Sequence, residues 1–174
     1  MATHPDGRPV AGLSQEALVE AARRILGSVA GPEAAAAMPV ESFRDDSWVR
    51  LPAAHAVAVL RGLRDDAATG FEVCMDVTCV HYPRRPEPLG PFDVVYHLVS
   101  ISKGHRLRLK VACPDPEKGV DSVTPVWRGA NFLEREAHDM FGVRFAGHPD
   151  PRRILMSDDY DGWPMRKDFP YRGH

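Results

Sequence analysis

The sequence of 174 residues contains only three cysteines and no long apolar run. Three cysteines cannot all pair within one chain, and a domain of this length buries enough apolar surface to fold without disulfides. The most apolar stretch, residues 53–60, is far shorter than the roughly 20 residues that span a bilayer, and the first ten residues contain no secretory apolar segment. We therefore expect a reducing, cytoplasmic compartment and no transmembrane segment.

A basic excess is also absent, because 22 Lys and Arg residues are balanced by 24 Asp and Glu residues. This balance excludes the whole-chain positive charge that is typical of nucleic-acid-binding proteins. The chain lacks the glycine-rich loops that bind nucleotide phosphates, the G-x-S-x-G nucleophile motif and the H-E-x-x-H zinc motif. These patterns predict no catalytic or cofactor-binding residue.

Cys74 and Cys79 have the C-x4-C spacing that opens a plant-type iron–sulfur motif. The C-x2-C that should follow is missing, so an iron–sulfur cluster is not expected. Because successive side chains alternate between the two faces of a strand, the odd separation predicts that these cysteines lie on opposite faces, as small buried residues.

The composition that remains, 44% apolar and 26% charged residues, is typical of a globular domain. Helical spacing of apolar residues predicts a helix that begins after Ser14 and ends at Gly27. Residues 40–51 are expected to form one or two short strands. Pro52 suits the first position of a second helix that ends near residue 66.

Alternating apolar residues predict three further strands. In residues 71–80 the expected apolar face consists of Phe71, Val73, Met75, Val77 and Cys79. The next two strands cover about residues 92–102 and 105–112 and form a hairpin. The last strand carries a row of basic residues that we interpret as a solvated face that discourages edge-to-edge pairing, namely Arg106, Arg108 and Lys110.

A third helix is expected to end at Phe141, with Gly142 in the left-handed conformation that stops it. Two alternative N-cap residues are possible for the start of this helix. Either Thr124 caps the helix and Pro125 opens it, or Asn131 caps it with a glutamate three residues later. Both alternatives give an apolar stripe along one side of the helix.

The segment after this helix differs in composition from the rest of the chain. Eight Gly and Pro residues within residues 142–174 exclude a long helix, yet many large apolar side chains remain. Such a segment cannot bury its apolar groups alone, which predicts that it docks on something else. We therefore divide the chain into a flexible N-terminus at 1–11, an α/β core domain at 12–141 and an extended partner-binding arm at 142–174.

One group of side chains is compatible with a metal site. Glu134 and His138 lie four residues apart on one helix face, and His148 follows soon after. The interpretation that we favour is that Glu134 with His138, and Arg135 with Asp139, form ordinary i,i+4 pairs on the polar side of the helix. A small metal-dependent enzyme stays open as the alternative of another class.

Three blocks of the sequence resemble a known family. They are residues 134–142 (EREAHDMFG), 147–156 (GHPDPRRILM) and 161–170 (DGWPMRKDFP). In this order they closely resemble the C subunit of NADH-quinone oxidoreductase, which is respiratory complex I. A looser likeness extends over about residues 12–170.

The resemblance implies an α+β fold: a two-layer α/β domain with a mixed, hairpin-containing sheet, flanking helices and an extended C-terminal arm. It also implies a non-catalytic, cofactor-free structural subunit in the hydrophilic arm of a proton-pumping NADH:quinone oxidoreductase. That subunit would be peripheral, on the cytoplasmic side of the inner (plasma) membrane. NADH, FMN, iron–sulfur clusters and quinone would belong to other parts of the complex.

The partners implied by the resemblance are the D subunit, near the quinone site, and other hydrophilic-arm subunits such as B and I. No nucleic acid is expected as a partner. An equivalent subunit of a membrane-bound hydrogenase, a formate hydrogenlyase or a ferredoxin- or F420-dependent complex is the alternative within the same class.

The family motif implies partner-binding residues but no catalytic, cofactor-binding or metal-binding ones. The implied partner-binding residues are Glu134, Arg135, Glu136, Asp139, Gly142, His148, Pro149, Arg152, Arg153, Gly162, Pro164, Arg166, Lys167, Asp168, Phe169 and Pro170. Mixed charges in the arm favour ion pairing with a protein over phosphate binding. We expect four basic residues to bind partner carboxylates: Arg152, Arg153, Arg166 and Lys167.

Overall fold

A computed structural model describes residues 12–44 and 46–170. Its elements follow in the order α1 (Gln15–Ala30), α2 (Pro32–Ala36), β1 (Val40–Phe43), β2 (Asp46–Leu51), a 3-10 helix η1 (Ala53–His55), α3 (Ala56–Asp65), β3 (Val73–His81), β4 (Phe92–Ser100), β5 (His105–Cys113), β6 (Val120–Asp121), α4 (Ala130–Phe141) and β7 (Phe145–Ala146). The N-terminus predicted to be flexible, residues 1–11, lies outside the described residues. No helix in the described ranges is long and apolar enough to cross a bilayer.

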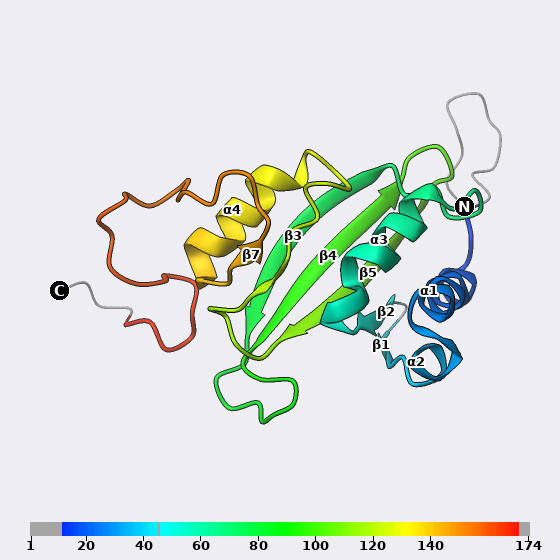
Figure 1. The fold of residues 1–174 in the computed structure, drawn as a ribbon, viewed down its shortest axis with the longest axis horizontal. Helices are drawn as coiled ribbons and strands as arrows, with labels where there is room; N and C mark the ends of the chain where they lie inside the picture. Colours follow the sequence, from blue (N-terminus) through cyan, green and yellow to red (C-terminus); the bar gives the residue numbers. More distant parts are fainter. Residues whose placement is uncertain (1–11, 45, 171–174) are drawn as a thin grey trace.

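Five strands form one mixed sheet in the order β1-β2-β5-β4-β3 (Figure 1). The β4–β5 hairpin forms as predicted, with Phe92 opposite Cys113 and Ser100 opposite His105. β2 pairs with β5 in the parallel direction, whereas the other pairs in this sheet are antiparallel. A short parallel pair, β6 and β7, stands apart. The predicted α+β class with a mixed sheet and flanking helices is therefore confirmed.

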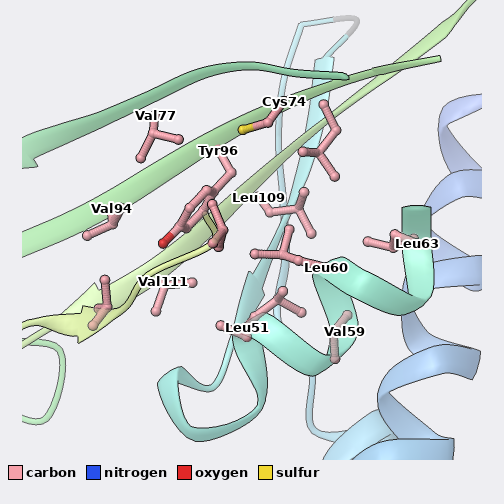
Figure 2. Packing of buried hydrophobic residues seen from close by; sticks show 14 of the residues in the cluster. Leu51, Val59, Leu60, Leu63, Cys74, Val77, Val94, Tyr96, Leu109 and Val111 are labelled. Carbon is pink, nitrogen blue, oxygen red and sulfur yellow. The ribbon is translucent and has the colours of Figure 1, made fainter. Parts of the chain in front are cut away.

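The hydrophobic core lies between one face of the sheet and the helices. Buried side chains of α1, α3 and α4 join those of β2 to β5 in a single cluster. Figure 2 shows Leu60 of α3 pointing toward Leu109 of β5, with Tyr96 of β4 beside them. Each of these three side chains is at most 1% exposed. Burying one leucine contributes about 1.5 to 3 kcal/mol, so this layer supplies much of the stability.

A β-bulge between Cys74 and Asp76 changes which residues of β3 point into the core. An extra residue at a bulge shifts the alternation of the strand by one position. As a result, Cys74 and Cys79 both face the core and Met75 is 54% exposed. The predictions that the two cysteines lie on opposite faces, and that Met75 belongs to the apolar face, were wrong.

The helix ends differ from the predictions at several points. α1 continues past Gly27 and stops at Gly31, whose φ of 91° ends it. Gly27 instead provides space for α2, because a Cβ there would lie 3.3 Å from the Cβ of Ala35. Pro52 precedes η1 rather than opening α3. α4 begins after Gly129 without a side-chain cap, so neither predicted cap was correct.

The basic row of β5 lies in the middle of the sheet. β5 pairs with β4 along its length and with β2 from Arg108 to Val111, so Arg108 and Lys110 have no free edge to protect. Lys110 is half-buried, with its Nζ 4.2 Å from the ring centroid of Trp48. The predicted role in preventing edge-to-edge pairing was therefore wrong for Arg108 and Lys110.

The substitution Leu109→Asp is expected to unfold the domain. A carboxylate without a partner in the core costs several kcal/mol, against a total stability of about 5 to 15 kcal/mol. Ile101→Asp is the matched control, because that side chain is 70% exposed. Circular dichroism melting measures both variants, and an unchanged melting curve for Leu109→Asp would contradict this account of the core.

Candidate partner-binding site

Helix α4 ends at Gly142, which adopts the predicted left-handed conformation with φ 71°. Its N–H donates to the carbonyl oxygen of His138 at 2.7 Å. A Cβ at this position would lie 2.5 Å from side-chain atoms of both Trp163 and Arg166. Glycine is thus required twice, for the backbone conformation and for the close approach of the arm to the helix.

Asp139 is fully buried on the same helix and binds the first part of the arm. Its Oδ2 accepts the backbone N–H groups of Ile154, Leu155 and Met156 at 3.0, 2.7 and 2.9 Å. Its Oδ1 accepts a hydrogen bond from the guanidinium of Arg153 at 2.6 Å. Burial alone raises the pKa of Asp139, but these donors outweigh it and hold the pKa at about 2. An ionised carboxylate therefore fixes the backbone of the arm.

Arg153 extends this contact toward the third motif block. It donates to the carbonyl oxygens of Tyr160 at 3.1 Å and Gly162 at 3.3 Å. The centre of its guanidinium lies 4.5 Å from the ring centroid of Trp163. One arginine thus connects both ends of the loop at 153–163.

Arg135 binds the arm rather than Asp139. Its guanidinium donates to the carbonyl oxygens of Arg152 and Arg153, at 2.9 Å each, and lies 3.5 Å from the carboxylate of Asp150. The predicted i,i+4 pair between Arg135 and Asp139 was wrong. Asp139 faces inward, and groups of the arm occupy both of its oxygens.

Glu134 is also fully buried, although it was predicted on the polar side. Its carboxylate accepts hydrogen bonds from the Ser122 hydroxyl and the Val123 N–H, both at 2.6 Å. The predicted pair with His138 was wrong, and the nearest imidazole nitrogen is Nε2 of His148, at 3.8 Å. Burial raises the pKa of Glu134 to about 7. The carboxylate of Glu134 has only two hydrogen-bond donors, which replace less of its lost hydration than the larger number of donors around Asp139.

The two histidines of the alternative metal site form hydrogen bonds to backbone carbonyl groups instead. His138 Nδ1 donates to the carbonyl oxygen of Val143 at 3.1 Å, and His148 Nε2 donates to that of Asn131 at 3.1 Å. Within residues 12–44 and 46–170, no three His, Cys, Asp or Glu side chains are placed to hold a metal ion. The geometry therefore gives no support to a metal site at Glu134.

The distal part of the arm contacts the end of the sheet. Arg166 donates to the carbonyl oxygen of Phe141 at 2.6 Å, and its guanidinium lies 5.1 Å from the ring centroid of Phe92. The Lys167 N–H donates to Nδ1 of His81 at 3.1 Å. Sequence analysis did not identify His81 or Phe92, because no local pattern signals a contact across more than 70 residues.

The predicted site residues divide into an inner and an outer group. Those that are buried or half-buried are Glu134, Arg135, Asp139, Gly142, His148, Arg153, Gly162, Pro164, Arg166 and Phe169. Those that are exposed are Glu136, Pro149, Arg152, Lys167, Asp168 and Pro170. No sequence pattern indicated Phe132, which is 62% exposed on α4. The arm lies at the α4 end of the molecule, far from α1 (Figure 1).

Comparisons with known proteins identify the family of this chain. Residues 49–174 match the family described as "Respiratory-chain NADH dehydrogenase, 30 Kd subunit". The C subunit of NADH-quinone oxidoreductase from Hyphomonas neptunium is 51% identical over 120 residues, which cover 69% of this chain and 57% of the relative. The corresponding C subunit from Geobacter sulfurreducens is 44% identical over 140 residues, which cover 80% of this chain and 84% of the relative.

Two solved structures share the fold. The trypsin-resistant fragment of Nqo5 has a TM-score of 0.60 and 33% identity, and the match covers 78% of this chain and 97% of the fragment. A chain of the membrane-bound sulfane sulfur reductase, an archaeal respiratory membrane complex, has a TM-score of 0.68 and 26% identity. That match covers 90% of this chain and 85% of the other.

The fold and the three motif blocks define a subunit of the kind found in respiratory complexes. The chain belongs to the family of the 30 kDa subunit of respiratory-chain NADH dehydrogenase, whose curated members similar to this chain are named as the C subunit of NADH-quinone oxidoreductase. This confirms the resemblance seen in the sequence. The chain spans little more than half the length of the Hyphomonas relative, at 57%.

The raised pKa of Glu134 predicts that stability falls as the pH rises. Below about pH 4.5 the carboxyl is protonated in both the folded and the unfolded chain. Between about pH 4.5 and pH 7 it ionises in the unfolded chain but stays protonated in the folded chain. The difference corresponds to a loss of about 3 kcal/mol across this window. Glu134→Gln should remove that loss, as measured by urea unfolding at several pH values. Parallel curves for the variant and the unaltered chain would contradict the prediction.

Asp139→Asn is expected to loosen the arm without unfolding the core. Hydrogen bonds to a charged group contribute about 1.5 to 3 kcal/mol, so amide exchange at residues 154–156 should accelerate about tenfold or more. Asp161→Asn, at an exposed position of the arm, is the control. Hydrogen–deuterium exchange measures both variants, and unchanged protection of residues 154–156 in Asp139→Asn would show that another contact holds the arm.

Proposed function

We propose that this chain is a non-catalytic, cofactor-free structural subunit in the hydrophilic arm of a proton-pumping NADH:quinone oxidoreductase. In this proposal helix α4 and the arm at 142–174 pack against the D subunit near the quinone site. Subunits such as B and I are further neighbours. The complex would hold the chain on the cytoplasmic side of the inner (plasma) membrane and would carry NADH, FMN, iron–sulfur clusters and quinone elsewhere.

The observation that carries the proposal is a fixed arm with apolar side chains on its outer side. Leu155 is 60% exposed and Met165 is 56% exposed, although the backbone around Leu155 is bonded to the buried Asp139. Phe132, on α4, is 62% exposed. Exposed apolar groups on an ordered segment are typical of a protein interface, and a segment that is already ordered loses less entropy on binding.

The charges of the outer group fit the rim of such an interface. Lys167 and Asp168 are exposed neighbours of opposite sign. Arg152 is also exposed and is paired with Asp150 at 2.7 Å. In contrast, the guanidinium groups of Arg153 and Arg166 are engaged within the chain. Among the four basic residues expected to bind a partner, Lys167 is therefore the better candidate, because it is exposed and Arg152 already pairs with Asp150.

The structural match to the archaeal complex supports a second candidate of the same class. That match covers 90% of this chain at 26% identity, and it concerns a respiratory membrane complex other than NADH-quinone oxidoreductase. An equivalent scaffold role in a related membrane-bound complex is therefore the alternative. The proteins that co-purify with the native chain decide between the two.

Leu155→Glu is expected to reduce assembly of the complex at least fivefold, because a charge would replace an apolar contact at the centre of the interface. Ile101→Glu is the matched control, since Ile101 is 70% exposed on the turn between β4 and β5. Both variants should melt like the unaltered chain. Affinity purification of the native complex, with identification of its subunits, measures assembly.

Turnover separates a scaffold role from a catalytic one. Quinone reductase activity per assembled complex should stay near normal in the Leu155→Glu variant, while the yield of complex falls. Full assembly with Leu155→Glu would contradict the proposed interface. Full assembly with lost turnover would contradict the non-catalytic role.

A further inference from the structure

The face of the sheet opposite the helices contains a broad hollow of about 830 Å³. Its walls come mostly from β2, β4 and β5 and from the residues around β1. Among the residues that the structure describes, charges of one sign dominate the lining, with three arginines and one aspartate, namely Arg44, Arg106, Arg108 and Asp46. The whole chain has a net charge of -2, so this hollow differs in sign from the molecule that carries it.

Crowding of cations continues beside the hollow along β5. Lys110 follows Arg108 on the same face of the strand and lies opposite Arg50 of β2 in the sheet. Burial lowers the pKa of Lys110, the carboxylates of Glu41 and Asp93 act in the opposite direction, and the neighbouring Arg50 and Arg108 lower it further. Burial and Arg108 likewise lower the pKa of His97 on β4, whereas Asp76 and Asp46 raise it. The cations repel one another, and the carboxylates nearby offset part of this repulsion.

Carboxylates of the described residues compensate for only part of this charge. Arg108 pairs with Asp46 at 2.7 Å, and Arg50 pairs with Asp93 at 2.6 Å and with Glu41 at 3.0 Å. Glu41 also lies 3.8 Å from Lys110. Arg106 is exposed and has no ion pair with any carboxylate of the described residues. Arg106 lies just outside the part of β5 that pairs with β2, which runs from Arg108 to Val111. Its guanidinium is available to a partner.

Aromatic and apolar side chains flank these cations. The indole N–H of Trp48 donates to Glu41 at 2.9 Å, and its ring lies 4.2 Å from Lys110 Nζ. Phe43 and Met75, which also line the hollow, are 65% and 54% exposed. Arginine, tryptophan, phenylalanine and methionine are enriched at protein interfaces, where aromatic and arginine side chains supply most of the binding energy.

We propose that this open face of the sheet is a second docking surface, which binds a carboxylate-rich segment of another subunit in the same complex. The proposal rests on the proposed function for the existence of that complex, but not on the contacts of the arm. Carboxylates of the segment would pair with Arg106 and its neighbours, and apolar groups would cover Met75 and Phe43.

The first test measures whether the face is covered in the complex. Met75→Cys introduces an exposed thiol into a chain whose three native cysteines are all buried. A maleimide should label position 75 rapidly in the isolated chain and at least about tenfold more slowly in the purified complex. Labelling after denaturation of the complex is the control for thiol reactivity. Equal labelling rates in the isolated chain and in the complex would overturn the proposal.

The second test identifies the occupant and its charge. A photoreactive phenylalanine analogue at position 75, activated in cells, should cross-link to a segment of another subunit rich in Asp and Glu. Arg106→Glu should lower the yield of complex at least fivefold, whereas Arg106→Lys should retain it. Arg61→Glu, on the exposed side of α3, is the control for the same change of charge in the helical layer.

The outcomes distinguish this proposal from the proposed function. Assembly that is lost with Leu155→Glu but normal with Arg106→Glu would overturn the docking surface alone. A cross-link to nucleic acid, to a second copy of this chain or to an uncharged segment would also overturn it. Co-purification of the chain without any subunit of a respiratory complex would overturn the proposed function, while the cross-linked partner would still show whether this face binds an acidic segment.

Discussion

The arrangement of α4 and the arm depends on one buried carboxylate. Asp139 accepts three successive backbone N–H groups of residues 154–156 together with the guanidinium of Arg153. A buried charge is costly unless donors surround it, and a segment without helix or strand needs acceptors for its backbone N–H groups. The backbone N–H groups of the arm stabilise the buried charge, and the carboxylate in turn accepts their hydrogen bonds. The arm therefore has a defined path, which places Leu155 on the outside.

Two carboxylates on one helix respond to burial in opposite ways. Glu134 has two donors at its carboxylate, and its pKa rises to about 7, whereas the donors around Asp139 lower that pKa to about 2. Glu134 joins α4 to the segment after β6, and Asp139 joins α4 to the arm. α4 thus has two inward-facing acidic groups with separate tasks, one toward the core domain and one toward the proposed interface. Because both carboxylates are hydrogen-bonded, this polar helix contacts the core domain on one side and the arm on the other.

Sequence patterns predicted the elements better than the contacts between them. Period-two alternation located β4 and β5, and a glycine signalled the end of α4 at residue 142. The bulge beside Cys74 and the parallel insertion of β2 depend on pairing between distant strands, which no local pattern reveals. The motif blocks indicated the site residues, but i,i+4 spacing gave the wrong partners for Glu134 and Asp139. Their partners lie 11 or more residues away, and burial makes those distant hydrogen bonds outweigh exposed pairs.

The central claim is that a preformed arm presents its outer side to a partner subunit. Alkylation of Leu155→Cys, compared between the isolated chain and the purified complex, tests this claim most directly, since the native cysteines are buried. The account predicts rapid alkylation of the isolated chain and strong protection in the complex, with residues 154–156 protected from amide exchange in both states. Equal alkylation in both states, or amide protection that arises only on assembly, would contradict it.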